Sequence, residues 1–167
     1  HAYREHGRFT LRAQATDPHG SYEASPLEIE VDDVPPTVSL QGASDVNEGA
    51  EFTLEIGSPM DPGLDVVTGY TIDWGDGSPL ENGVIFQGIG AGALGGMHTY
   101  ADQGTYTVNV AVMDNNGGSD SDTFHVIVGQ VAPTATFSNN GPVDEGSPAT
   151  VSFSNQFDPS SADTLVG

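Results

Sequence analysis

The segment from Tyr106 to Val112 alternates strictly between larger apolar residues and small or polar ones. A period of two is typical of a β-strand that buries one face. Similar alternation occurs at Glu51–Ile56, Gly69–Trp74 and Asp122–Val128, and no window has convincing helical periodicity. The sequence therefore predicts an all-β protein whose strands each bury one side.

Two motifs in the same region point to a known type of β-domain. Residues 73–77 are Asp-Trp-Gly-Asp-Gly, and residues 98–110 are His-x-Tyr-x-x-x-Gly-x-Tyr-x-Val-x-Val, followed by Asp-x-x-Gly at 114–117. The combined pattern resembles the PKD (polycystic kidney disease) domain, an immunoglobulin-like Greek-key β-sandwich. That family usually opens with Trp-Asp-Phe-Gly-Asp-Gly. Here Ile72 and Trp74 stand at the Trp and Phe positions, which keeps the tryptophan on the same strand face.

The resemblance orders the predicted strands as A, B, C, a short strand, F and G. Just before strand F, Asp102-x-Gly104-x-Tyr106 fits a tyrosine corner, in which the Tyr hydroxyl bonds to upstream backbone. We expect His98 to pack or hydrogen-bond at the start of strand F, and the glycine-rich Gly88–Met97 to be a loop or edge segment. The strand boundaries that we predict are Thr37–Gln41, Glu51–Ile56, Gly69–Trp74, a short strand near Gly83–Gln87, Gly104–Met113 and Asp122–Val128.

The chain contains an internal repeat. Residues 1–36 align without gaps onto residues 98–133, so the offset is 97, and the match continues through Asp61-Pro62 and Asp158-Pro159. One inserted residue then brings Gly69 opposite Gly167. A period of this size corresponds to one immunoglobulin-like unit of about 100 residues.

The repeat predicts tandem immunoglobulin-like, PKD-type sandwiches. Residues 1–34 would be the C-terminal strands, F and G, of a first unit, and residues 35–131 would be a complete domain. Residues 132–167 would be the N-terminal strands, A and B, of a third unit. Prolines mark both junctions and disfavour continued strand pairing there. We therefore expect this chain to be a window from a longer tandem array or fibre.

Acidic residues dominate the charge. Asp and Glu number 24 against 3 arginines and no lysine, the net charge is −21, and no permanent cation follows Arg12. Such self-repulsion opposes a compact state unless cations screen it, so bound divalent ions or high salt would relieve it. The alternative is simply a solubilising acidic surface. Nucleic acid is excluded as a partner, because phosphate binding needs Lys and Arg.

Composition excludes several further classes. No apolar window of about 20 residues exists, so we expect no membrane insertion. The chain has 0 cysteines, which excludes disulfides and cysteine-based zinc sites. The histidines lack the spacing of a helical zinc site, and no Gly-x-Ser-x-Gly elbow is present. Asp73 and Asp76 could be imagined as a catalytic pair, but the PKD resemblance implies that they cap and hydrogen-bond the turn after strand C. We expect no enzymatic activity.

The best candidate site is for calcium. In a Greek-key sandwich, the incoming linker, the B–C loop and the F–G loop meet at one end, and calcium binds about six to eight oxygen ligands. The A–B turn, with Glu48, and the E–F turn, with Asp102, lie at the other end and face the next unit. Residues 114–122, which include the candidate ligands of the F–G loop, could instead form an ordinary turn without a metal ion. The metal-ligating candidates are Asp32, Asp33, Asp61, Asp65, Asp114 and Asn116.

Calcium at such a junction would hold neighbouring units at a fixed angle. At the second junction, Gly129-Gln130 replaces Asp32-Asp33, so we expect a weaker site or none there. The favoured function is a structural repeat of an extracellular surface, adhesive or filament-forming protein. Its partners would be neighbouring repeats or copies of the same protein, with a glycan or another surface protein as a further candidate. The rival is a non-catalytic binding or spacer module attached to a secreted hydrolase, because domains of the PKD family occur beside such enzymes.

Overall fold

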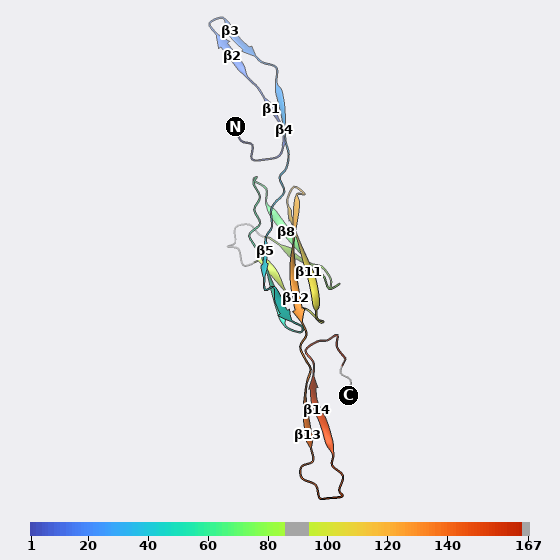
Figure 1. Cartoon of the computed structure of the whole chain (residues 1–167). Coiled ribbons are helices and arrows are strands. Elements are labelled where there is room, and N and C mark those ends of the chain that lie inside the picture. Colours follow the sequence, from blue (N-terminus) through green and yellow to red (C-terminus); the bar gives the residue numbers. More distant parts are fainter. Residues whose placement is uncertain (86–93, 165–167) are drawn as a thin grey trace.

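The computed structural model describes residues 1–85 and 94–164. Every regular element in these residues is a strand, and none is a helix able to cross a membrane. Figure 1 shows a central β-sandwich with one long hairpin extending from each end, so that the N- and C-terminal segments lie at opposite poles.

The central unit consists of two sheets. The larger sheet has five strands and the smaller has three. The order in the larger sheet is β6 (Asp45–Asn47), β12 (Ser119–Gly129), β11 (Gly104–Asp114), β8 (Val67–Asp73) and β9 (Glu81–Val84). The order in the smaller sheet is β10 (Leu94–Thr99), β7 (Glu51–Ile56) and β5 (Leu40–Gly42).

The apolar faces of the two sheets form one core. The alternation predicted for Glu51–Ile56 is confirmed, because every second residue of β7 is buried. In β11 and β12 the inward valines Val108, Val110, Val112, Val126 and Val128 are buried, whereas Tyr106 and Phe124 are partly buried. The buried cluster comprises Phe52, Leu54, Ile56, Ile72, Trp74, Tyr100, Val108, Val110, Val126 and Val128. The prediction of an all-β sandwich is therefore correct.

One predicted detail of the strands differs from the structure. Strand A is divided: β5 pairs with β7 in one sheet, and β6 then pairs in parallel with β12 in the other. For the described part of the glycine-rich region, the edge alternative is confirmed, because β10 lies at the edge of the smaller sheet and pairs with β7 along its whole length. Gly88–Ala93 and Phe86-Gln87, which the predictions also covered, lie outside the described residues.

The aromatic residues around Trp74 fix the ends of strands β8 and β10. The tyrosine corner is confirmed, since the Tyr106 hydroxyl donates to the Asp102 carbonyl over 2.9 Å. The expected position of His98 at the start of strand F is wrong, because it lies in β10, but the expectation that it packs is confirmed. There its ring stacks on Trp74 with a centroid distance of 4.9 Å. The Tyr100 hydroxyl donates to the Trp74 carbonyl over 3.1 Å.

The terminal hairpins repeat part of the strand pairing of the central unit. In the N-terminal hairpin, Gly7 pairs with Val31, as Gly104 pairs with Val128 at an offset of 97. Farther out in this hairpin, Gln14 pairs with Glu23, which is one residue out of register with the central pair Ala111 and Ser121. In the C-terminal hairpin, Phe137 pairs with Phe153, as Leu40 pairs with Ile56 at the same offset. The hairpin strands are β1 (Gly7–Leu11), β2 (Gln14–Asp17), β3 (Gly20–Glu23) and β4 (Leu27–Val31), followed at the other end by β13 (Thr134–Asn139) and β14 (Val151–Phe157).

Aromatic packing at the N-terminus repeats the central unit as well. The rings of His1 and Tyr3 meet edge-on at 4.8 Å, and those of His98 and Tyr100 do so at 4.7 Å. Most hairpin side chains are nevertheless exposed, including Phe137, which is 63% exposed. In the described residues, neither hairpin has a second sheet to cover its apolar side chains, as the central unit does. Two strands alone bury too little apolar surface to be stable independently.

Candidate metal centre

Three loops meet at the end of the sandwich that faces the N-terminal hairpin (Figure 1). They are the linker after β4, the loop between β7 and β8, and the turn between β11 and β12. The loop is tied to the hairpin, because the Leu64 N–H donates to the Arg4 carbonyl over 3.1 Å. The turn is tied to the loop through Asn115, whose Oδ1 accepts from the Val66 N–H over 2.7 Å.

The tightest group of ligand atoms at this end comes from His6, Asp33 and Asp65. One ligand atom of each lies within 4.8 Å of the others. His6 Nδ1 and Asp33 Oδ1 are 3.7 Å apart. The amide of Asn116 donates to Asp65 Oδ1, which connects the turn between β11 and β12 to the same group.

Asp61 lies beside this group. Its Oδ1 accepts from the Gly63 N–H over 2.9 Å, which closes a tight turn at the tip of the loop. A Cβ placed on Gly63 would lie 3.1 Å from Asp65 Oδ2 and 3.3 Å from Asp61 Oδ1, so both carboxylates flank this glycine. Asp61 Oδ2 is buried and has no hydrogen-bond partner among the described residues.

Asp114 is the most buried acid at this end, at 6% exposure. Its Oδ1 accepts from the backbone N–H groups of Asn116, over 2.7 Å, and Gly118, over 2.8 Å. Its Oδ2 is buried without a hydrogen-bond partner in the described part of the chain. A Cβ on Gly118 would lie 2.2 Å from that oxygen and 3.0 Å from Asp33 Oδ2, so the two carboxylates converge.

The electrostatic environment opposes negative charge. Burial, followed by repulsion from Glu5, Asp33 and Asp61, raises the pKa of Asp65, and only His6 acts in the opposite direction. A bound cation would reverse this repulsion, because an opposite charge nearby favours the ionised carboxylate. The arrangement can therefore offer several oxygens to a hard cation such as calcium.

The structure brings most of the predicted ligands together. Asp33, Asp61 and Asp65 line one hollow, and the exposed Asp32 lines it too without belonging to the tight group. Asp114 and Asn116 approach from the neighbouring turn. Sequence analysis missed Glu5 and His6. In the repeat, Glu5 and His6 align with Asp102 and Gln103 of the E–F turn. Since that turn was expected to face the next unit, the alignment could have revealed that Glu5 and His6 face the central sandwich.

A second acidic group lies at the opposite end of the sandwich and was also missed as a set. It consists of Glu48, Asp158 and Asp163, with one ligand atom of each within 4.8 Å of the others. Glu48 comes from the turn between β6 and β7, and the two aspartates follow β14. The signal for it was again the repeat, because Asp158 matches Asp61 and, after the inserted residue, Asp163 matches Asp65.

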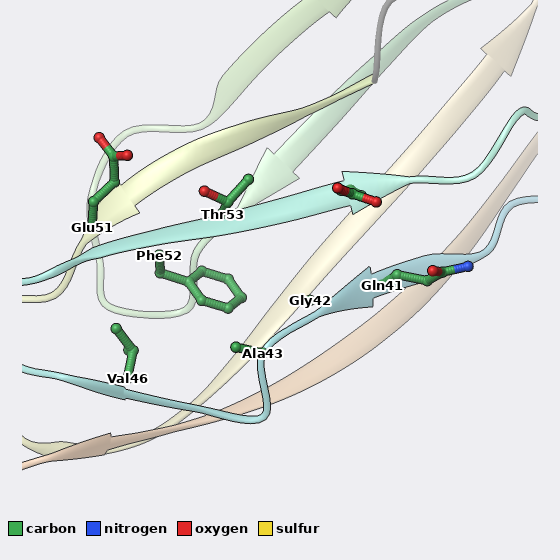
Figure 2. Close-up of a pocket in the computed structure, with 8 residues that line it drawn as sticks. Gln41, Gly42, Ala43, Val46, Glu51, Phe52 and Thr53 are labelled. Carbon is green, nitrogen blue, oxygen red and sulfur yellow. The ribbon is translucent and has the colours of Figure 1, made fainter.

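A shallow groove on the smaller sheet is a poor candidate for ligand binding. Small-molecule pockets are mostly apolar and rich in exposed aromatic surface. The one aromatic residue of this groove, Phe52, is 1% exposed, and Figure 2 shows its ring on the opposite side of β7 from Glu51 and Thr53. The groove is lined by Gln41, Gly42, Ala43, Val46, Glu51, Phe52, Thr53 and Glu55.

A family model described as the PKD domain matches residues 33–128, the whole central sandwich. The chain belongs to the PKD domain family. PKD domains are non-catalytic modules, and they are typically extracellular. The match includes the Asp73–Gly77 motif and the tyrosine corner, so the resemblance inferred from these residues is correct.

Two solved structures are similar to this PKD chain. One is the PKD domain of an M14-like peptidase from Thermoplasmatales archaeon SCGC AB-540-F20, with 28% identity, a TM-score of 0.44, and coverage of 58% of this chain and 98% of that one. The other comes from work on promiscuous carbohydrate-binding modules of the β-sandwich superfamily, with 17% identity, a TM-score of 0.48, and coverage of 74% and 54%. No curated protein matches the chain.

Proposed function

We propose that this chain is a structural repeat of an extracellular surface or filament-forming protein, in which PKD units stack end to end and divalent ions stiffen the junctions. The observation that carries the proposal is the recurrence, at an offset of 97, of the register between β1 and β4 and of the register between β13 and β14. A repeated register means that these strands pair as the corresponding strands of the PKD unit do. Tandem units of one design bury surface against their neighbours, as in other repeat proteins.

The contacts at the two junctions support end-to-end stacking. At the first junction the Arg4 carbonyl accepts from the Leu64 N–H over 3.1 Å. At the second, the Ala101 carbonyl accepts from the Ser160 hydroxyl over 2.6 Å. Arg4 and Ala101 are equivalent in the repeat, and Leu64 and Ser160 lie in equivalent loops. The same upstream turn therefore contacts the same downstream loop twice.

Calcium at the first junction would use the carboxylates of Asp33, Asp61, Asp65 and Asp114, with Asp32 and the Asn116 amide oxygen as outer candidates. Two of these acids have a buried oxygen without a partner in the described residues. Oxygen-rich sets of this kind suit calcium. The ring nitrogen of His6 is a ligand that zinc prefers, so zinc is the competing ion in any test.

The test is thermal unfolding in calcium and in chelator at low ionic strength. A ligand at one hundred times its Kd adds roughly 2.7 kcal/mol per site, and we expect Tm to rise by several degrees. Asp65→Asn should reduce the rise, whereas Asp144→Asn, an exposed acid in the loop between β13 and β14, should not. An unchanged Tm in calcium would remove the ion from the proposal. A larger rise of Tm in zinc than in calcium would identify zinc as the ion of this site.

The rival function is a binding or spacer module beside a secreted hydrolase. A pull-down on glycan arrays and insoluble polysaccharide separates the two. A structural repeat should be retained by neither. Saturable retention that is lost on substitution of a groove residue such as Gln41, with the calcium response intact, would favour the rival.

A further inference from the structure

The second acidic group is built around a fully buried carboxylate. Glu48 is 1% exposed, although glutamate is rarely buried without a partner. Its Oε1 accepts from the Val131 N–H over 2.6 Å, which fixes the side chain against the linker to the next hairpin. Its Oε2 is buried and has no hydrogen-bond partner in the described residues. A buried carboxylate oxygen without a partner is energetically costly, so Glu48 Oε2 is suited to accept a ligand such as a water molecule or a cation.

The spacing of the three carboxylates fits one ion. Calcium lies about 2.3–2.6 Å from its oxygen ligands, so two ligands on opposite sides of it are roughly 5 Å apart. Ligand atoms of Glu48, Asp158 and Asp163 all lie within 4.8 Å of one another. All three are carboxylates, and an oxygen-only set favours calcium over zinc or copper.

The loop that carries Asp158 and Asp163 is held in place by hydrogen bonds. Ser160 is 5% exposed, and its hydroxyl donates to the Ala101 carbonyl over 2.6 Å while accepting from the Asp163 N–H over 3.2 Å. Asp158 Oδ1 accepts from the Ser160 N–H over 3.0 Å. The loop also touches the turn beside Glu48, because a Cβ on Gly49 would lie 2.4 Å from the Pro159 carbonyl oxygen.

No lysine or arginine balances these acids in the described part of the central sandwich and the C-terminal hairpin. The last arginine in the sequence is Arg12, and the chain has no lysine. Burial, followed by repulsion from Glu48, Asp158 and Asp102, raises the pKa of Asp163. The three carboxylates are thus brought together in the fold against their mutual repulsion.

We propose that Glu48, Asp158 and Asp163 form a calcium site that bridges the central sandwich and the C-terminal hairpin. The site shares no residue with the group at the first junction, so it can exist whether or not that group binds an ion; only its stiffening role rests on the proposed function. The expectation of a weak or absent second site rested on Gly129-Gln130 replacing Asp32-Asp33. Glu48 was expected at this end of the sandwich, but it was not combined with Asp158 and Asp163 as one set of ligands.

The test combines calorimetric calcium titration of the whole chain, freed of metal, with hydrogen exchange of two segments. Residues 158–164 report on this site and residues 61–65 on the first junction. We expect calcium to slow exchange in residues 158–164. Glu48→Gln should weaken binding at this site at least about tenfold and abolish that protection, since affinity depends on the number of ligand charges. The glutamine can still accept from the Val131 N–H, so the fold should persist.

Two further variants keep the test decisive. Asp163→Asn, at an exposed position, should have the same effect if Glu48→Gln proves unstable. Asp65→Asn should leave protection of residues 158–164 unchanged, even if the first junction loses its own. Calcium binding that slows exchange only at residues 61–65, or a response in residues 158–164 that survives both Glu48→Gln and Asp163→Asn, would overturn the proposal.

Discussion

Among single residues, Asp76 has the most sharply defined environment. Its Oδ1 accepts from the Ser78 N–H over 3.0 Å, and its Oδ2 lies 2.7 Å from His98 Nε2. Burial alone would raise the pKa of Asp76, but hydrogen bonds from Ser78 and His98 lower it to about 2. The predicted role of Asp76 in the turn is therefore correct, and the histidine adds an interaction across to β10.

This environment makes the contribution of Asp76 to stability dependent on pH. An aspartate with a depressed pKa stabilises the fold above its unfolded pKa, and the effect is lost as pH falls from about 4 to about 2. A shift of nearly two units corresponds to roughly 2 kcal/mol. Asp76→Asn should therefore lower the free energy of unfolding by about that amount at pH 7, and by much less near pH 2.

Urea unfolding at several pH values measures this difference. Asp73→Asn is the matched control, since Asp73 accepts from the Gly75 N–H over 3.0 Å in the same turn. It has no histidine partner in the described residues. A difference between wild type and Asp76→Asn that stayed constant from pH 7 to pH 2 would contradict the assignment.

At the scale of elements, β10 depends on glycine. Gly96 passes beneath the core tryptophan: a Cβ there would lie 2.8 Å from a ring carbon of Trp74 and 3.0 Å from Ile72 Cδ1. Glycine thus allows the edge strand to approach the core closely. This is also why the strand was hard to predict, because strands are normally recognised by branched and aromatic residues.

Replacing Gly96 should show how tight this contact is. Gly96→Ala forces the added methyl against Trp74, and overpacking of this kind destabilises by about 1–3 kcal/mol. Gly129→Ala is the control, because its added Cβ would meet atoms no closer than 3.5 Å. Thermal or urea unfolding compares the two, and tryptophan fluorescence should change only for Gly96→Ala. Equal stability of both variants would mean that β10 can move away from the core.

Much of the sandwich was predictable from alternation alone, because β7, β11 and β12 each bury one face. The division of strand A into β5 and β6 could not be predicted in this way, since a change of sheet leaves no mark in side-chain periodicity.

The approach of Asp33 to Asp65 could be predicted, because the loops that carry them share an end of the sandwich. The role of Glu48 could not be predicted, because its partners come from the following hairpin and its burial depends on that contact.

At the scale of the whole molecule, charge is the dominant feature. The net charge is −21, and the arginines all lie in the first twelve residues, where Arg8 is 3.7 Å from Glu28 and 3.9 Å from Glu30. The central sandwich and the C-terminal hairpin contain no lysine or arginine. Repulsion between unpaired charges is long-ranged at low salt and is screened beyond about 10 Å at 0.1 M.

Salt should therefore stabilise this protein even when divalent ions are absent. In chelator, raising NaCl from about 0.05 M to about 1 M should increase Tm by several degrees, because the screening length falls to about 3 Å. Scanning calorimetry at constant pH measures the change, and the same scan in an uncharged osmolyte separates screening from general exclusion effects. A Tm that falls or stays level with NaCl would show that the acids are already balanced.

The carbonyls of Arg4 and Ala101 each hold the loop of the following segment, and this has a consequence for a longer array. If PKD units stack in the proposed way, the same contact recurs at every junction, so any change in the angle between neighbouring units accumulates along the array. One altered side chain in that loop would then change the curvature and persistence length of the whole filament, while each unit kept its own fold.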